Sequence, residues 1–90
     1  MEYLVLVIHS VKDYRKWRPV FDAHEEARRL AGMMQPRVFR NVDHPEELVV
    51  ELRTSNLRIA REFLQSDDLK ARMAEGGVAS SPITYFLEAV

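Results

Sequence analysis

The sequence predicts an α+β fold in which one four-stranded antiparallel sheet carries helices on a single face. Two observations predict it. Segments with strand and helix patterns follow one another in the order β-α-β-β-α-β along the 90 residues. The first strand segment is apolar on both sides, which is typical of a strand inside a sheet. Two right-handed crossovers and one central hairpin then give the strand order 4-1-3-2, a ferredoxin-like sandwich.

Residues 3–10, YLVLVIHS, form the predicted first strand. We assign Leu6 to the face of the sheet that the helices cover. Alternation along the predicted strand 47–53 puts Leu48, Val50 and Leu52 on the same face. The opposite face then holds four residues that no helix of the same chain covers: Tyr3, Val5, Val7 and Val49. A second copy of the chain is the simplest cover, so we expect a homodimer.

A helix is predicted from Asp13, its N-cap, to about Ala31, with Gly32 ending it. At about 100° per residue, one side of this helix collects four residues: Trp17, Phe21, His24 and Ala31. Arg28 falls in the same sector, where its stem can cover apolar surface while its head reaches water. Pro19 removes a backbone donor, so we expect a bent or 3₁₀-like turn at 13–17 and regular helix from Arg18.

The rest of the chain supplies three strands and the second helical region. Residues 35–42 and 47–53 alternate as strands around a turn that contains Pro45, and the last strand spans 83–90. Thr54 or Ser55 is the expected cap of a helix over 56–66, whose buried stripe is Ile59, Ala60, Phe63 and Leu64. Ser66 or Asp67 caps a further short helix that ends at Gly76 and Gly77.

Length and composition indicate one small domain, residues 1–90, that needs additional stabilisation. On folding, a chain of this size buries only about 60–65% of the surface that its unfolded form exposes to water. It has no cysteine, which excludes disulfides and thiolate metal sites and agrees with a reducing cytoplasm. Self-association is therefore the expected supplement.

Charge and hydropathy argue against two classes of partner. The formal net charge is −1, and no basic stripe is interleaved with aromatic residues, so we expect no nucleic-acid binding. The longest apolar run, Leu4 to Ile8, is far shorter than the ~20 residues of a membrane span. No basic segment precedes it, so we expect no signal peptide and a cytoplasmic protein without a membrane partner.

Three segments carry a resemblance that covers about residues 3–88: HSVKDYRKWRPVFDAHE, RVFRNVDHPEELVVEL and AREFLQSDDLKARMAEGGV. They resemble small, uncharacterised bacterial members of the dimeric α/β-barrel superfamily, which are similar to antibiotic-biosynthesis monooxygenases and cyclase-like proteins. The resemblance implies a homodimer whose two sheets close into an α/β barrel. It also implies cofactor-independent monooxygenation, isomerisation or cyclisation of a small aromatic or polyketide-like compound. The Asn, Trp and His set of the haem-degrading members has no equivalent here, so haem degradation is not implied.

His24 is the candidate catalytic residue, because it lies in the apolar stripe of the first helix beside Trp17 and Phe21. Histidine is the usual general acid or base near neutral pH. The alternative is a core histidine whose ring bonds a backbone carbonyl or a carboxylate. Five further residues are candidates for ligand binding: His9, Tyr14, Trp17, Phe21 and Tyr85. The aromatic members of this set are equally suited to a core.

The spacing of histidines and glycines predicts neither a metal site nor a cofactor. His9, His24 and His44 show no HxH or HExxH spacing, and His44 lies in the hairpin turn. Three glycines form no Gly-rich loop that could hold a nucleotide or flavin phosphate. The sequence thus favours a small-molecule-binding dimer, with its ligand either under the helices or inside the barrel. The alternative is a non-catalytic dimeric stress or interaction module with a structural His24.

Overall fold

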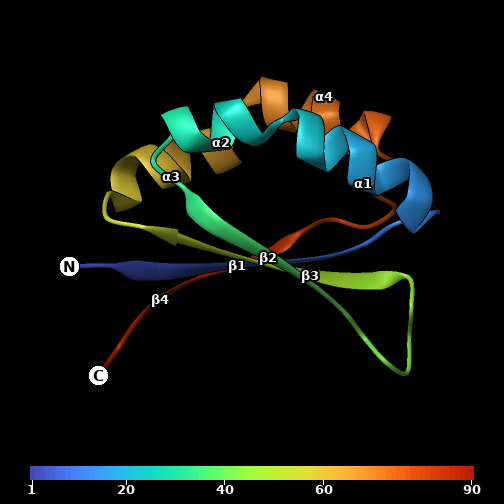
Figure 1. The fold of residues 1–90 in the computed structure, drawn as a ribbon, viewed down its shortest axis with the longest axis horizontal. Helices are drawn as coiled ribbons and strands as arrows, with labels where there is room; N and C mark the ends of the chain where they lie inside the picture. Colours follow the sequence, from blue (N-terminus) through green and yellow to red (C-terminus); the bar gives the residue numbers. More distant parts are fainter.

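The computed structural model describes residues 1–90 and contains one four-stranded antiparallel sheet with four helices on one side (Figure 1). Its elements are β1 (Tyr3–Ser10), α1 (Tyr14–Ala23), α2 (Glu25–Leu30), β2 (Met34–Arg40), β3 (Glu47–Thr54), α3 (Leu57–Leu64), α4 (Asp67–Glu75) and β4 (Ile83–Glu88). The sheet order is β2-β3-β1-β4, and every neighbouring pair is antiparallel. This confirms the predicted order 4-1-3-2, counted from the other edge.

The first helical region is interrupted at a different place from the one expected. The Asp13 carboxylate accepts from the Arg15 N–H at 2.9 Å, so the predicted cap is confirmed. The expected irregular turn at 13–17 is wrong, because the α-helix begins at Tyr14 and includes Pro19. The missing donor of Pro19 removes one bond without interrupting the capped turn before it. The interruption falls instead at His24, whose N–H bonds the Phe21 carbonyl at 3.1 Å and which separates α1 from α2.

Side-chain oxygens also cap the later helices α3 and α4, but the cap of α3 is not at the predicted residue. Asn56, not Thr54 or Ser55, caps α3, because its side chain accepts from the Ile59 N–H at 3.1 Å. Thr54 ends β3, and its hydroxyl accepts from the Asn56 N–H. The Ser66 hydroxyl caps α4, as predicted. The expected stripe of α3 is confirmed, since Ala60 is fully buried and its three companions pack against the core.

The two faces of the sheet are opposite to our assignment for β1. Directly paired residues of an antiparallel ladder point to the same side of the sheet. Val5 pairs with Leu52 and Val7 with Val50, and all four are buried beneath the helices. Leu6 pairs with Glu51 and therefore lies on the face without helices. The assignment was wrong because β1 is apolar on both sides, so its pattern does not specify the register.

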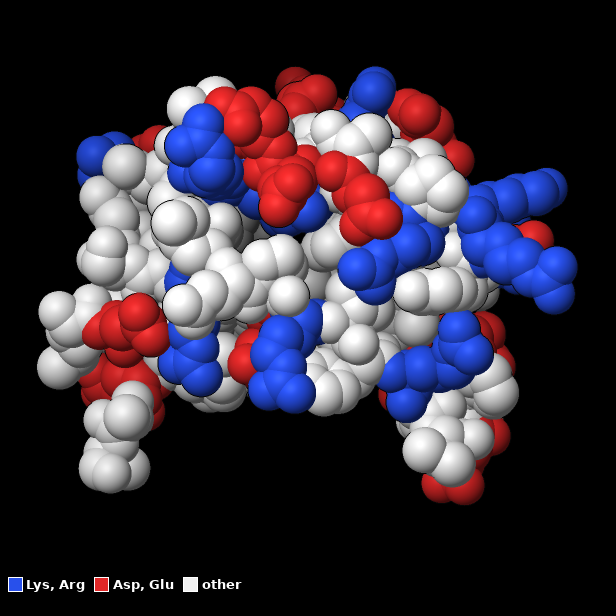
Figure 2. All heavy atoms as spheres, viewed as in Figure 1, with Lys and Arg blue, Asp and Glu red and all other residues white.

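The hydrophobic core lies between the sheet and the helices. Ten buried apolar residues form it: Val5, Val7, Val11, Trp17, Ala31, Met33, Leu48, Val50, Leu52 and Ala60. The outer side of the helices carries charges of both signs, interspersed on the face that Figure 2 displays. Several form ion pairs one helical turn apart, such as Arg18 with Asp22 and Arg58 with Glu62. No helix has the length and the apolar composition needed to cross a bilayer.

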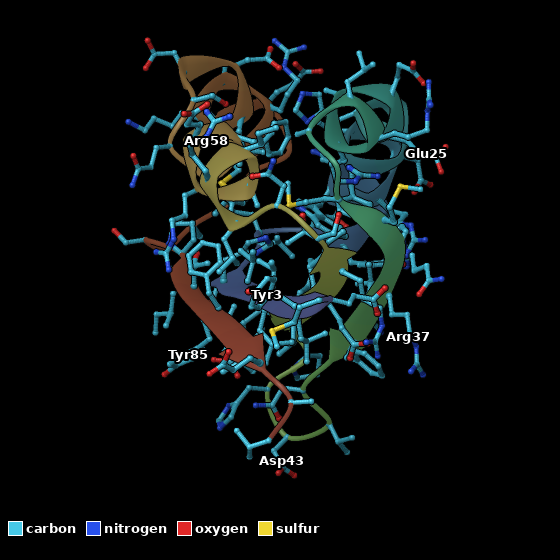
Figure 3. The ribbon with its side chains drawn as sticks, turned by 90° about the vertical axis from the view of Figure 1, so that its left-hand side faces the viewer. Tyr3, Glu25, Arg37, Asp43, Arg58 and Tyr85 are labelled. Carbon is cyan, nitrogen blue, oxygen red and sulfur yellow. The ribbon has the colours of Figure 1, made fainter.

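The face of the sheet without helices is largely apolar, and Figure 3 shows Tyr85 and Arg37 on the sheet, away from the helices. Strand pairing puts nine apolar or aromatic residues there: Leu4, Leu6, Ile8, Met34, Phe39, Val49, Ile83, Tyr85 and Leu87. Ile83 is 54% exposed and Phe39 is 41% exposed. Arg37, Glu51 and Arg53 add charges of both signs to the same face. We refer to this surface as the open face.

Leu48 provides a test of the corrected facing, because it is fully buried under the helices. Leu48→Ala should lower the free energy of unfolding by about 2–5 kcal/mol, the usual cost of truncating a buried leucine. Urea denaturation measures this change. The same substitution at Leu30, which is 74% exposed on α2, should change stability by less than about 1 kcal/mol. A loss at Leu48 as small as that at Leu30 would contradict the assignment.

Candidate functional site

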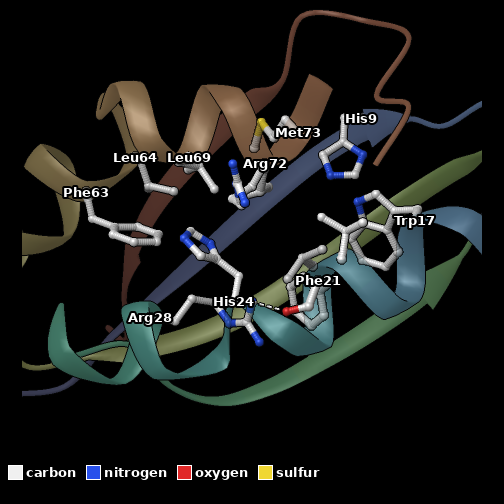
Figure 4. Close-up of a pocket in the computed structure, with 13 residues that line it drawn as sticks. His9, Trp17, Phe21, His24, Arg28, Phe63, Leu64, Leu69, Arg72 and Met73 are labelled. Atoms are coloured by element: carbon white, nitrogen blue, oxygen red, sulfur yellow. Dashed lines mark hydrogen bonds between the residues drawn. The ribbon is translucent and has the colours of Figure 1, made fainter. Parts of the chain in front are cut away.

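A narrow pocket lies between α1 and α2 on one side and α3 and α4 on the other, above the sheet (Figure 4). Its volume is about 50 Å³, and nine of its thirteen lining residues are hydrophobic. The remaining four are His9, His24, Arg28 and Arg72. The site is therefore an apolar cavity with a few convergent polar groups, which is the usual composition of a small-molecule site.

Aromatic rings from β1 and α1 form one wall of the pocket. Trp17 and Phe21 lie one turn apart on α1 and stack with ring centroids 4.8 Å apart. The His9 ring meets the Trp17 ring edge-on at 5.6 Å. Gly76 allows the end of α4 to approach Trp17, because a Cβ there would lie 3.1 Å from Trp17 Cδ1. The indole is consequently only 4% exposed.

His24 lies at the junction of α1 and α2, and its ring reaches across to the other helical pair. Its Nε2 is 2.7 Å from Asp68 Oδ2, in the first turn of α4, and its ring stacks on Phe63 at 5.6 Å. An ionised carboxylate only accepts hydrogen bonds, so Nε2 carries a hydrogen, and in the neutral form of the ring the lone pair is then on Nδ1. The residue is 9% exposed, whereas the Asp68 side chain is 64% exposed.

Arg28 places a guanidinium in the pocket wall. The residue is 5% exposed, and its Cζ lies 3.7 Å from the centre of the Phe21 ring. Its Nη1 donates to the Phe21 carbonyl at 2.7 Å, and no carboxylate forms an ion pair with it. Burial lowers the pKa of Arg28, although nearby Glu25 and Asp22 act in the opposite direction. The stem and most of the head are covered, with the head packed on Phe21, and only Nη1 of the guanidinium has a hydrogen-bond partner in the chain.

Two further polar atoms of the pocket residues are buried without a protein partner. They are His9 Nδ1 and Arg72 Nε. Arg72 pairs with Glu75 through Nη1 at 3.1 Å, which leaves Nε unused. His9 is 4% exposed, and its burial lowers its pKa, which favours the neutral ring.

The structure brings together four of the six candidate residues. His9, Trp17, Phe21 and His24 all line the pocket. Tyr14 lies beside Trp17 at 6.0 Å but outside the lining, where its hydroxyl accepts from Arg18 Nη1.

Tyr85 lies on the open face, half exposed and paired with Leu6, so it is on the opposite side of the sheet from the pocket. Tyr85 is therefore not part of this pocket, and its candidacy as a ligand-binding residue inside a barrel stays a prediction.

Sequence reasoning missed Asp68, Phe63 and Arg72 as parts of the site. Asp68 follows the Ser66 cap, where an acidic residue is common because it interacts favourably with the helix N-terminus. Nothing local distinguishes it from Asp67, and it is 44 residues from His24. No group of three or more His, Cys, Asp or Glu side chains that could hold a metal ion is present.

Comparison with known proteins identifies the fold. No family model matches the chain, and neither does any curated protein. A Bordetella bronchiseptica protein, provisionally assigned as an antibiotic biosynthesis monooxygenase, aligns with a TM-score of 0.81 and 14% identity over 99% of this chain and 97% of its own. SnoaB, a cofactor-independent oxygenase from Streptomyces nogalater, aligns with a TM-score of 0.72 and 12% identity over 98% of this chain and 92% of its own.

The chain has the ferredoxin-like fold of the antibiotic biosynthesis monooxygenases. A similarly assigned protein from Caulobacter crescentus CB15 gives a TM-score of 0.76 at 17% identity, over 99% of this chain and 90% of its own. The resemblance suggested by the three sequence segments is thus confirmed at the level of the fold.

The burial of His9 predicts that stability depends on pH. Because its pKa is lowered in the folded protein, the unfolded chain binds a proton at pH values where the folded chain does not. The contribution of neutral His9 is fully present above about pH 6.5 and is lost as the pH falls toward the lowered pKa. One proton limits the slope to about 1.4 kcal/mol per pH unit. Chemical denaturation between about pH 7.5 and pH 5 measures it.

Two variants separate His9 from the other histidines in this experiment. His9→Phe keeps an aromatic ring against Trp17 and removes the titrating group, so its stability should fall less steeply on acidification than that of the wild type. His44→Gln, in the hairpin turn, should follow the wild type. Parallel profiles for wild type and His9→Phe would contradict the prediction.

Proposed function

We propose that the chain is a small-molecule-binding protein whose pocket transfers a proton to or from a small aromatic compound. The observation that carries the proposal is a buried His24 ring held by Asp68 in a pocket that is otherwise mostly apolar and aromatic. A base oriented by a carboxylate is a recurring arrangement for general acid–base catalysis. The reaction class is cofactor-independent oxygenation, with isomerisation or cyclisation as the related alternatives.

In this proposal, His24 Nδ1 accepts a proton from an acidic C–H group of the substrate. Asp68 stabilises the imidazolium that forms, and Trp17 and Phe21 position the planar ring. In an oxygenation, the carbanion gives its electrons to O₂, a CH₂ group becomes a carbonyl, and the second oxygen atom leaves as water. In an isomerisation, the same proton returns to a different atom of the substrate. Both routes need the same base.

The comparisons support the reaction class, and the site supports the choice of residues. SnoaB is described as a cofactor-independent oxygenase, and it has the same fold. This fold hosts many functions, so the fold alone does not assign an activity. The proposal therefore depends on the position of His24 and Asp68 in the pocket.

Replacing His24 tests the catalytic role. Phenylpyruvate is a suitable probe, because its benzylic CH₂ is acidic and its exchange in D₂O is followed by NMR. The wild type should accelerate this exchange, and His24→Phe should reduce the acceleration by about 10²–10⁴-fold, the usual contribution of a general base. Its stability should change by less than about 1.5 kcal/mol, because phenylalanine keeps the apolar bulk.

His44→Phe is the matched control, since His44 is exposed in the hairpin turn and should leave the exchange rate unchanged. Asp68→Asn should reduce the acceleration less than His24→Phe does, because the base itself remains. Equal exchange in wild type and His24→Phe would remove the catalytic role and favour the non-catalytic module with a structural His24.

We also propose that a second copy of the chain covers the open face. Its apolar residues come from all four strands, and no helix of the same chain lies over them. Two such faces packed together would close the α/β barrel that the resemblance implies. An interface of this kind should bury well over about 1,000 Å².

Sedimentation equilibrium tests this proposal. The wild type should sediment at twice the chain mass of 10.5 kDa at micromolar concentration. Leu6→Glu should produce monomers, because the new carboxylate would lie directly opposite Glu51 in the strand pair and would be buried beside a like charge. Leu30→Glu, on the exposed side of α2, should remain dimeric. A wild-type monomer of normal stability would contradict the proposal.

A further inference from the structure

The charged side chains in the pocket wall are all of one sign. Arg28 and Arg72 line the pocket, together with His9 and His24, and no aspartate or glutamate is among the thirteen lining residues. Asp68 holds His24 from the edge, where its side chain is mostly in solvent. A cavity with apolar walls strengthens electrostatic interactions inside it. Arg72 pairs with Glu75, so Arg28 is the cation of the lining without a carboxylate partner, and it favours an anionic ligand.

Arg28 lacks the partner that a buried cation normally has. A guanidinium has five N–H donors, and Arg28 uses one, toward the Phe21 carbonyl. Three exposed arginines of the same chain each pair with a carboxylate one helical turn away: Arg18, Arg29 and Arg58. Burying a charge without a counter-ion is costly, so a buried arginine without one marks a place for an anion that the chain does not supply.

Two further unpartnered atoms belong to residues that line the same cavity. His9 Nδ1 and Arg72 Nε are the two buried side-chain polar atoms without a partner in the chain, and both residues line this pocket. Figure 4 shows Arg72 reaching the pocket from α4 while Arg28 reaches it from α2. Buried polar groups are normally satisfied, so unpartnered groups gathered in one cavity indicate a ligand with polar atoms of its own.

We propose that the pocket binds a single-ring aromatic carboxylate, with its carboxylate on Arg28 and its ring against Phe21 and Trp17. This rests on the proposed function as a small-molecule site and specifies the class of ligand. The Arg28 Cζ lies 3.7 Å from the centre of the Phe21 ring, and the guanidinium donors other than Nη1 have no partner in the chain. A planar fork of donors matches a carboxylate in a bidentate geometry.

The size of the pocket restricts the ligand to one ring. Its volume of about 50 Å³ is smaller than the ~150 Å³ cavity that holds benzene in an engineered protein. Even a single ring therefore needs the flexible side chains of Leu69 and Met73 on α4 to move aside. A fused polyketide skeleton would need the helices themselves to separate. A phosphate would leave the nine hydrophobic lining residues without contact.

Titration calorimetry with benzoate and benzamide tests the inference, because the two probes share a shape and differ in charge. Benzoate should bind the wild type at least about tenfold more tightly than benzamide. Arg28→Gln should lose this preference by weakening benzoate binding about tenfold or more while benzamide binding stays the same. Arg58→Gln, at an exposed arginine of α3, should bind both probes as the wild type does.

The preference of the wild type for benzoate over benzamide tests the inference even if Arg28→Gln folds poorly. Arg28→Lys provides a second variant, which keeps the positive charge but removes the planar guanidinium. Equal or tighter binding of benzamide overturns the carboxylate while the pocket proposal stands. Competition by inorganic phosphate, or equal losses in Arg28→Gln and Arg58→Gln, shows surface anion binding and also overturns it. If neither benzoate nor benzamide binds at about 10 mM, the proposal that this pocket is a small-molecule site is overturned as well. Benzoate binding without phenylpyruvate exchange refutes only the proton transfer.

Discussion

The structure depends on a sheet that is covered on one side only. Its central strand β1 has apolar residues on both sides, so each side needs its own cover. Val5 and Val7 face the helices with Leu52 and Val50 opposite them, and the same alternation brings His9 to the pocket beside Trp17. The other side presents Leu6 to the surface. The pocket and the proposed dimer interface are thus the two sides of one strand, and a change of register by one residue would exchange them.

The site exists because the first helical region stops and restarts at His24. A continuous helix would carry the stripe of Trp17 and Phe21 onward without a break. The interruption instead sets His24 at the boundary of α1 and α2, from which its ring reaches Asp68 on α4. Gly76 then allows the far end of α4 to close against Trp17. The pair α1 and α2 and the pair α3 and α4 thus pack around a cavity, and the polar residues His9, His24 and Arg28 are buried in its wall.

Local signals predicted the fold and part of the site. Asp13 and Ser66 cap helices through their own side chains, and the left-handed Gly32 ends the first helical region, so each could be recognised from its neighbours in sequence. The spacing of Trp17, Phe21 and His24 similarly predicted a shared helical side.

The errors concern long-range pairing. The facing of Leu6 depends on the register between strands far apart in sequence, and a doubly apolar strand does not encode it. Asp68 as the partner of His24 depends on the packing of helices across the cavity, which no spacing within one helix reports.

The two proposals about the pocket support each other through charge. Arg28 is a cation of the pocket wall that no carboxylate of the chain pairs with, whereas Asp68 already contacts the His24 ring. A bound carboxylate neutralises Arg28 first. Proton transfer from the substrate to His24 then creates an imidazolium whose counter-ion, Asp68, is already in place. An anionic substrate would therefore assemble the charge balance that its own deprotonation requires, which gives a physical reason for a base and an unpaired buried arginine to share one cavity.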